Sequence, residues 1–431
     1  MNNDTLEIPK STKAPLGYKQ TAVGIIPEDW EIRTLGEITN YIKGFAFKSD
    51  IYTTEGVRII RISDTTSNSI KEEGAIYIDY DEASKYKKWE LKLNDLVFTT
   101  VGSRPPMYDS MVGKVIKIEE KYKGALLNQN AVIIRSKEFA YQEFIFNQFK
   151  VKRYLEFIET IVRGNANQVS ITLDNLFKYQ LIFPPLPEQQ KIASILSTWD
   201  VAIDNCKAII EELKVRNKGL TQKLLSGKIR VKGFSENWKV KVMNECLNFT
   251  PRPIEKPSEN YLALGLRSHG KGVFHKNDFD PASIAMETIY EVKENDLIIN
   301  ITFAWEHAVA IVSKKDEGGL VSHRFPTYTF NSQNAIPDFF RHFVLQKHFK
   351  FLLELISPGG AGRNRVMSKI DFLKLEIKLP NIAEQKVIAN ILDKATEELD
   401  QYQQKLQTLQ LQKKGLMQQL LTGKVRVKNL K

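Results

Sequence analysis

Two segments of this chain repeat one another without a gap, one in the middle and one at the end. Residues 188–232 align with residues 384–428 at a constant offset of 196, and 19 of the 45 paired residues are identical. The similarity continues upstream, where Asp174 matches Asp371 after a one-residue shift. A repeat of this size predicts a chain built from two copies of one structural unit.

The region in front of each repeat resembles its counterpart only faintly. Trp30 and Trp238 open the two regions in similar contexts, and the sequence Asn-Asp-Leu recurs at Asn94 and Asn295. Each unit is therefore expected to be a divergent globular part followed by a near-constant helix. The predicted divisions are a polar N-terminal tail (1–16), a first globular domain (17–186), a first long helix (187–226), a second globular domain (227–382), a second long helix (383–422) and a basic C-terminal tail (423–431).

Composition restricts the class of protein. The 42% of hydrophobic residues is enough for more than one core. The polar first residues do not resemble a signal peptide, and no apolar run reaches the length of a membrane span, so a cytoplasmic location without membrane contact is expected. Two cysteines, Cys206 and Cys246, make neither a disulfide framework nor a zinc set. A net charge of +11 favours a polyanionic partner.

The repeated segments have the apolar spacing of long helices. Pro187 suits a first helical turn, Asn381 suits an N-cap, and Gly227 and Gly423 lie where helices end. Each helix would contain about 39 residues and extend about 58 Å. Its narrow apolar stripe predicts pairing with a second helix along a seam formed by Ile192, Ile195, Ile203, Ile210, Leu213, Leu220, Leu224, Ile388, Ile391, Leu399, Leu406, Leu409, Leu416 and Leu420.

The order of the parts predicts how the two helices pair. If a pseudo-twofold axis relates the two units, the second helix runs back along the first, so the pair is antiparallel, as in a coiled coil. Polar Asn217 and Lys413 lie at equivalent seam positions and could fix the register. The alternative is that each helix packs only on its own globular domain.

Each globular domain mixes short apolar runs of β-forming residues with one helical stretch. The runs in the first domain are 57–62, 96–100 and 131–134, and the helical stretches are near 139–162 and 337–356. The predicted fold class is therefore α+β, with two globular domains of mixed β-sheet and helices separated by two long helices in a pseudo-twofold repeat. The basic tails beyond Gly227 and Gly423 are interpreted as contacts to phosphate or to an acidic partner.

Catalytic and cofactor motifs are weak. Neither Pro-Pro pair, at Pro105 or Pro184, follows the Asn or Asp that an adenine methyltransferase would need, and the glycine run at 359–362 completes no nucleotide-binding pattern. Residues Glu376-Ile377-Lys378 imitate part of a nuclease site but are predicted to be an ordinary strand. The six histidines lack metal-ligand spacing. We therefore predict no catalytic, cofactor-binding or metal site in this chain.

Several segments resemble one known family. The run RGNANQVSITLDNLFKYQLIFPPLPEQQKIASIL is similar to the end of a target recognition domain and the start of the spacer helix in specificity subunits of type I restriction-modification systems. GYKQTAVGIIPEDWEIRTLGEI, IKGFAFKSDIYTTEGVRIIRISD, LKLNDLVFTTVGS and ALLNQNAVIIRS also resemble its recognition domain. The second half departs more, with Asn-Ile-Ala at 381–383 in place of Pro-Leu-Pro.

The resemblance implies a DNA-binding subunit without catalytic activity of its own. Each domain would read one half of an asymmetric bipartite target in double-stranded DNA, in defence against phage. The helices would set the spacing and dock two modification subunits, which bind S-adenosylmethionine and methylate adenine N6. Restriction subunits would add ATP- and Mg-dependent translocation and cleavage. Half-sites on one face of DNA would lie on the order of one to two turns of about 34 Å apart.

Candidate DNA contacts are basic and amide side chains near turn signals, because these groups read base edges and phosphates. Loops 163–168 and 359–365 are expected to occupy matching positions and to read different bases. The candidates are Lys43, Lys48, Arg58, Arg61, Arg104, Arg163, Asn165, Asn167 and Gln168 in the first domain, and Arg252, Arg267, Lys271, His275, Arg363, Asn364 and Arg365 in the second.

Two other functions remain compatible with the sequence. One is the specificity subunit of a type IIB enzyme or of a phage-exclusion methyltransferase system, which would keep the DNA reading and change the partner. The other is a coiled-coil spacer protein that does not bind DNA, which predicts no salt-dependent DNA affinity.

Overall fold

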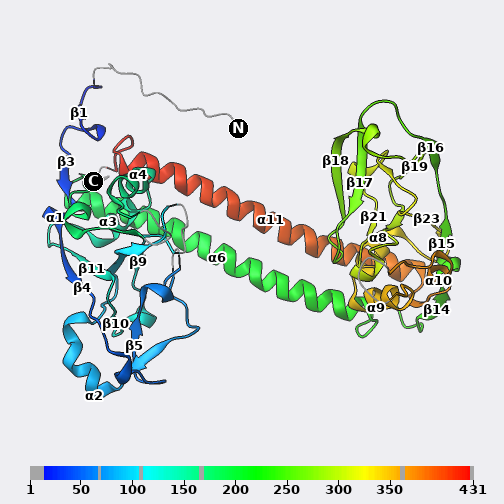
Figure 1. Cartoon of the computed structure of the whole chain (residues 1–431), viewed down its shortest axis with the longest axis horizontal. Helices are drawn as coiled ribbons and strands as arrows, with labels where there is room; N and C mark the ends of the chain where they lie inside the picture. The colour runs from blue at the N-terminus through cyan, green and yellow to red at the C-terminus, as the bar shows by residue number, and fades with distance from the viewer. Residues whose placement is uncertain (1–13, 67–68, 106–109, 165–168, 360–364, 428–431) are drawn as a thin grey trace. The chain divides into compact units, whose positions relative to one another are not determined.

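The computed structural model describes residues 14–66, 69–105, 110–164, 169–359 and 365–427. The chain divides into two compact units, Met1–Asn205 with Leu406–Lys431, and Cys206–Lys405 (Figure 1). Each unit contains one globular domain, the first part of its own long helix and the last part of the other long helix. This division differs from the predicted linear series of domains, because each helix belongs to both units.

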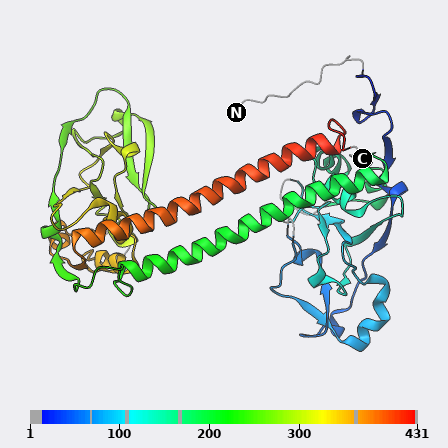
Figure 2. The same cartoon turned by 180° about the vertical axis from the view of Figure 1, so that it is seen from behind.

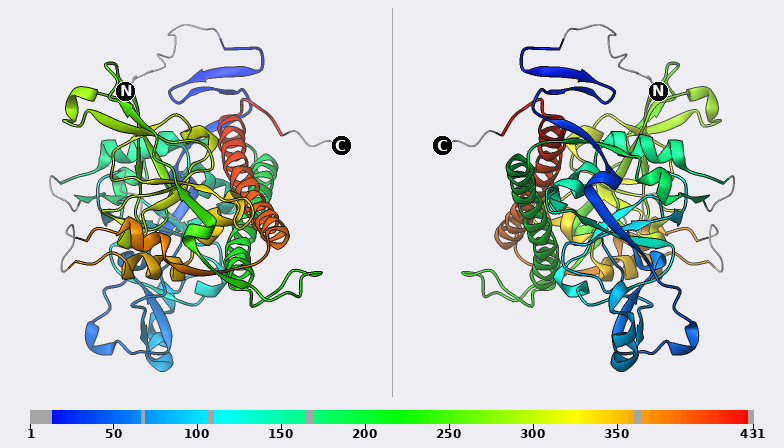
Figure 3. Two further views of the ribbon diagram at one scale, coloured as in Figure 1. Left: turned by 90° about the vertical axis from the view of Figure 1, so that its right-hand side faces the viewer. Right: turned by 90° about the vertical axis from the view of Figure 1, so that its left-hand side faces the viewer.

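In the first unit, a four-stranded sheet has the order β4-β11-β7-β9, and a three-stranded sheet has the order β10-β5-β6. The β1–β2 hairpin precedes them, and Figure 3 shows it in blue beside the red end of the second long helix. The elements are β1 (Tyr18–Thr21), β2 (Gly24–Pro27), β3 (Glu31–Thr34), α1 (Leu35–Ile38), β4 (Thr39–Lys43), β5 (Val57–Ile60), β6 (Ile76–Ile78), α2 (Tyr80–Ala83), β7 (Leu96–Thr99), β8 (Val101–Gly102), β9 (Val115–Lys117), β10 (Leu126–Leu127), β11 (Ala131–Ser136), α3 (Gln142–Gln148), α4 (Lys152–Ile161), β12 (Val169–Ser170), α5 (Leu173–Leu176), β13 (Gln180–Phe183) and α6 (Leu186–Leu225).

The second unit repeats this plan with one larger sheet. A four-stranded sheet has the order β15-β23-β20-β21, and a five-stranded sheet has the order β16-β19-β22-β17-β18. The elements are β14 (Lys239–Val242), α7 (Met243–Cys246), β15 (Leu247–Phe249), β16 (Pro253–Glu255), β17 (Tyr261–Leu266), β18 (Val273–Phe279), β19 (Thr288–Glu291), β20 (Leu297–Ile299), β21 (Val309–Ile311), β22 (Leu320–Val321), β23 (Thr327–Phe330), α8 (Pro337–Phe343), α9 (Lys347–Leu355), α10 (Lys369–Leu373), β24 (Glu376–Leu379) and α11 (Ile382–Leu421).

The α+β fold class is confirmed, and the repeated Asn-Asp-Leu sequence has a local explanation. Asn94 and Asn295 adopt positive φ angles of 65° and 69°, which asparagine tolerates better than most residues. Asp95 and Asp296 then accept hydrogen bonds from the backbone N–H groups three residues earlier, at 2.7 and 2.9 Å. The turn therefore starts the buried central strands, β7 and β20, in the same way in both domains.

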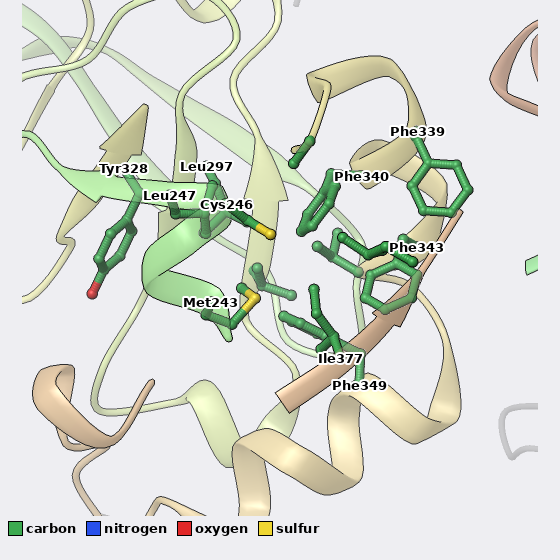
Figure 4. Close-up of a cluster of buried hydrophobic side chains, with 14 of the residues drawn as sticks. Met243, Cys246, Leu247, Leu297, Tyr328, Phe339, Phe340, Phe343, Phe349 and Ile377 are labelled. Carbon is green, nitrogen blue, oxygen red and sulfur yellow. The ribbon is translucent and has the colours of Figure 1, made fainter. Parts of the chain in front are cut away.

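A group of aromatic side chains lies in the core of the second domain. Phe339, Phe340 and Phe343 of α8 are buried with Met243 and Cys246 of α7 (Figure 4). The rings of Phe339 and Phe343 are stacked with 5.7 Å between their centroids. Burial of such side chains contributes about 1.5–3 kcal/mol each to folding, so this cluster fixes α8 against the sheet.

The long helices pair in antiparallel fashion within each unit, as predicted (Figures 1 and 2). In the first unit, Ile192 near the start of α6 shares a buried cluster with Leu420 near the end of α11. In the second unit, Leu224 near the end of α6 shares one with Ile388 near the start of α11. All fourteen predicted seam residues are buried or half-buried.

Two predictions about the helices need correction. Both long helices begin and end one residue earlier than predicted, at Leu186–Leu225 and Ile382–Leu421. The single helical stretch predicted in each globular domain is two helices, α3 with α4 and α8 with α9. Val151 is extended, with φ −85° and ψ 151°, and it interrupts the first stretch without a proline or glycine to mark the break.

Candidate nucleic-acid interface

The two predicted reading loops lie beside matching parts of the two domains. In the first domain, the Ile171 N–H donates to the Thr100 carbonyl at 2.9 Å, just after β7. In the second, the Met367 N–H donates to the Ile301 carbonyl at 2.9 Å, just after β20. The described ends of loops 163–168 and 359–365 therefore occupy equivalent places.

In the first domain, this place brings together two candidates that are distant in sequence. The guanidinium of Arg104 donates to the Gly164 carbonyl at 2.7 Å, and the backbone of Arg163 pairs with that of Ser170. Both arginine side chains are exposed. Two exposed cations on adjacent loops are suited to phosphate or base contact.

In the second domain, the β17–β18 turn joins the same group of loops. The N–H of His269 donates to the Glu306 carbonyl at 2.7 Å, and that of Gly270 donates to the His307 carbonyl at 2.9 Å. Lys271 is exposed at this turn. The loops after β17 and β20 are thus connected to each other by main-chain hydrogen bonds.

Two arginines of the second domain lie over aromatic rings. The guanidinium of Arg365 is 5.4 Å from the centroid of Trp305, and that of Arg267 is 5.7 Å from the centroid of Phe274. Such stacking holds the planar guanidinium in one orientation while leaving its N–H groups available. Among the described contacts, neither arginine has an acidic partner, so the aromatic rings hold the two side chains in place.

Four other candidates have partners within their own domain. Arg58 pairs with Glu72, and the guanidinium of Arg61 binds the buried Asp64, with a shortest contact of 2.8 Å. Arg252 binds the buried Asp296 at 2.5 Å, and His275 contacts the buried Asp316 at 2.7 Å. These contacts give each residue a structural role, and their contact with DNA stays a prediction.

The remaining candidates divide into two groups. Lys43, at the end of β4, and Lys48 are exposed. The others lie outside the described residues, and they are Asn165, Asn167, Gln168, Arg363 and Asn364.

One contact in each unit was not predicted from the sequence. A glutamate at the start of one long helix binds a tryptophan indole and an arginine that follows the other long helix, and we call this contact the clamp. In the first unit, Glu188 accepts a hydrogen bond from the Trp30 indole N–H at 3.0 Å and from the Arg426 guanidinium at 2.8 Å. Arg426 also binds Asp29 at 2.7 Å. Both acids raise the pKa of Arg426. The clamp therefore fixes the tail after α11 to the start of α6.

The second unit repeats the clamp with equivalent residues. Glu384 accepts from the Trp238 indole at 3.2 Å and from Arg230 at 2.8 Å. The arginines of both basic tails therefore neutralise buried carboxylates, and contact of the tails with phosphate or an acidic partner stays a prediction. A signal existed in the sequence, because Trp, Glu and Arg recur at matching places in the two units.

Polar residues interrupt the helix seam at equivalent positions. Asn217 donates to the Ala395 carbonyl at 2.6 Å, and Lys413 pairs with Asp200. Each contact satisfies a polar group at the seam, and a role of these two residues in fixing the helix register stays a prediction.

Within the described ranges, no group of three or more histidine, cysteine or acidic residues could hold a metal ion. His307 is buried, and its ring contacts the Val344 carbonyl at 2.6 Å. His342 contacts Asp393 at 2.8 Å. Among the described helices, none combines the length and the apolar character that crossing a membrane requires.

A family model described as the type I restriction modification DNA specificity domain matches residues 27–215 and 276–411. The chain belongs to this family. The matched segments include most of both globular domains and of both long helices, so we call them the target recognition domains and the spacer helices.

Two of the curated relatives align over nearly the full chain, and a third aligns over less than half of it. The chain is 27% identical over 430 residues to the putative type I restriction enzyme MjaX specificity subunit of Methanocaldococcus jannaschii, covering 95% of this chain and 97% of that protein. It is 23% identical to the MjaVIII specificity subunit of the same organism, covering 94% and 95%. It is also 28% identical over 187 residues to the EcoAI specificity subunit of Escherichia coli, covering 43% and 30%.

Solved structures share the fold. The S subunit of a type I restriction-modification system from M. genitalium has a TM-score of 0.54 at 15% identity, covering 91% of this chain and 96% of that one. A chain from a structure on complex assembly and conformational transition of the type I restriction-modification system has a TM-score of 0.54 at 14% identity, covering 93% and 99%. At these identities the likeness supports the fold of the specificity subunit and not its target.

Proposed function

We propose that this chain is the DNA-specificity subunit of a type I restriction-modification enzyme, and that each recognition domain reads one half of an asymmetric bipartite target. The most direct support is that the two recognition domains share one framework but carry different side chains on equivalent loops. The first domain presents Arg104 and Arg163, whereas the second presents Arg365 over Trp305 and Lys271 on a neighbouring turn. Different side chains at equivalent places read different bases.

The spacer helices bind two modification subunits, one for each repeat of the framework. We propose that this chain performs no chemistry itself, and that S-adenosylmethionine belongs to the modification subunits. Two restriction subunits with ATP and Mg complete the larger complex. Because its substrate is intracellular DNA, the enzyme acts in the cytoplasm. The full-length relatives are named as type I subunits, so the type IIB and phage-exclusion systems are not favoured.

DNA affinity of the assembled complex tests this function. The chain is co-purified with the modification subunit encoded beside it, and binding to labelled duplexes is measured by fluorescence anisotropy from 50 to 300 mM salt. We expect affinity to fall steeply with salt, since the loops contact phosphates, and to be higher for duplexes that contain the target. A stable complex with no salt-dependent DNA binding would instead support the non-DNA spacer protein.

A further inference from the structure

A cavity of about 530 Å³ opens in the first unit, where the start of α4 meets α6 and α11. Its apolar wall includes Val151, Ile203, Met417 and Leu421. This volume lies in the range of sites that bind ligands or partner side chains. Most of these apolar residues belong to the spacer helices, so a partner that binds the helices can reach the cavity.

Positive charge exceeds negative charge in the lining. Lys413 pairs with one carboxylate oxygen of Asp200, and the ammonium of Lys150 lies 4.0 Å from the other. Two ammonium groups thus share one carboxylate. The nearby Glu143 is engaged by Lys117 at 2.7 Å.

A guanidinium adds to this excess. Arg153 lines the cavity, and its Nη2 donates to the Gln180 carbonyl. The guanidinium carbon lies 5.5 Å from the centroid of the Tyr179 ring. The described contacts give Arg153 no carboxylate partner, so its charge adds to the positive excess of the lining.

The electrostatic environment of Lys150 favours the approach of an anion. Its side chain is 33% exposed and its ammonium lies 4.0 Å from the centroid of Phe146. Burial and the Lys413 and Lys117 ammonium groups outweigh the Asp200 and Glu143 carboxylates and lower the pKa of Lys150 to about 8. A carboxylate placed beside Lys150 would oppose this shift.

The second unit does not repeat this charge set. At the offset of 196, Thr396 matches Asp200 and Asn217 matches Lys413. Leu345, two residues before α9 begins, takes the place of Lys150, two residues before α4 begins. The lysine pair is therefore a property of the first unit alone.

We infer that this cavity docks an apolar segment of the modification subunit that carries an aspartate or glutamate side chain, and that the carboxylate binds between Lys150, Lys413 and Arg153. This inference rests on the proposed function. Because the charge set occurs in one unit, it stabilises one of the two bound modification subunits more than the other.

Assembly measured by mass photometry tests the inference. The full-length chain is mixed with purified modification subunit, and complexes with one and two copies are counted. Lys150→Glu should weaken binding of one copy by about tenfold or more, leaving mainly one-copy complexes, because reversal puts a like charge beside the incoming carboxylate. Lys413→Asn, which copies the matching Asn217, should weaken the same copy. The matched control is Lys178→Glu, an exposed lysine of the first domain outside the cavity lining.

Zero-length carbodiimide cross-linking supplies an independent readout on the wild-type complex. The reaction joins a lysine amine to a carboxylate with loss of water, so it should link Lys150 to an acidic residue of the modification subunit. Equal two-copy assembly of the wild type, Lys150→Glu and Lys413→Asn would overturn the inference, as would a Lys150 link to Asp200 alone. If the wild-type chain binds no modification subunit at all, the proposed function fails as well.

Discussion

Among single residues, the clamp glutamates are buried carboxylates whose partners lie far away in the sequence. Glu188 is 8% exposed, and both of its partners come from distant parts of the chain. A buried carboxylate that loses its cation remains desolvated and unpaired, which is costly. The clamp thus makes the tail after each helix part of the folded unit.

Arg426→Ala should therefore destabilise the first unit by about 2–4 kcal/mol, because Glu188 stays buried with two neutral donors, the Trp30 indole and the Val427 N–H, and no cation. Urea unfolding followed by tryptophan fluorescence measures the change. Arg216→Ala is the control, since the Arg216–Glu398 pair is half-exposed and should contribute less than about 1 kcal/mol. Similar unfolding midpoints for the two variants would contradict a stabilising role for the clamp.

Burial of His307 also makes the stability of the fold depend on pH. Burial lowers the pKa of His307 below its ordinary value of 6.5. The unfolded chain therefore binds more protons than the folded one as pH falls through 6.5, so stability decreases with falling pH in that window. His307→Asn should reduce this dependence between pH 7 and 5, since asparagine tolerates the local φ of 68° and does not titrate. Parallel stability curves for the variant and the wild type would show that His307 makes no contribution.

Residue types near turns predicted only part of the candidate interface. Arg252 and Arg58 had the chemistry expected of DNA contacts, yet Asp296 and Glu72 bind them from 44 and 14 residues away. Long-range partners of this kind depend on the fold and leave no local signal. Arg104 and Arg163 were selected separately, and only the structure shows that their loops are adjacent.

At the scale of elements, the spacer helices were the most predictable feature. Apolar residues at seam spacing, with glycine beyond each end, determine a helix almost independently of its surroundings. The break between α3 and α4 was not predictable in this way. Val151 is extended where the chain packs against the long helices, so tertiary packing decides it.

The reading loops give a prediction at the same scale. Exchanging 163–168 for 359–365 should change the sequence that is methylated, because these loops occupy equivalent places on a common framework. Assembly with the modification subunit should stay unchanged, since the exchanged residues lie outside both helices and both clamps. Methylated sites are read by single-molecule sequencing of host DNA. An unaltered motif in a fully assembled complex would remove these loops from the reading surface.

At the scale of the whole molecule, the duplication explains the division into units. Each clamp takes its arginine from the segment after one helix and its glutamate from the start of the other. Each unit therefore needs residues from both repeats to form its clamp. The sequence predicted the duplication and the antiparallel pairing, but the sharing of helices between units depends on contacts such as Arg426–Glu188, which are 238 residues apart.

In the proposed function, two different domains on one duplicated framework read one divided target. To test this, the chain is co-expressed with its modification subunit and methylated adenines are mapped across the host genome. We expect one asymmetric bipartite motif, with a fixed gap, that is lost when either recognition domain is deleted. No new methylation despite a stable complex, or a motif that survives loss of one domain, would contradict it.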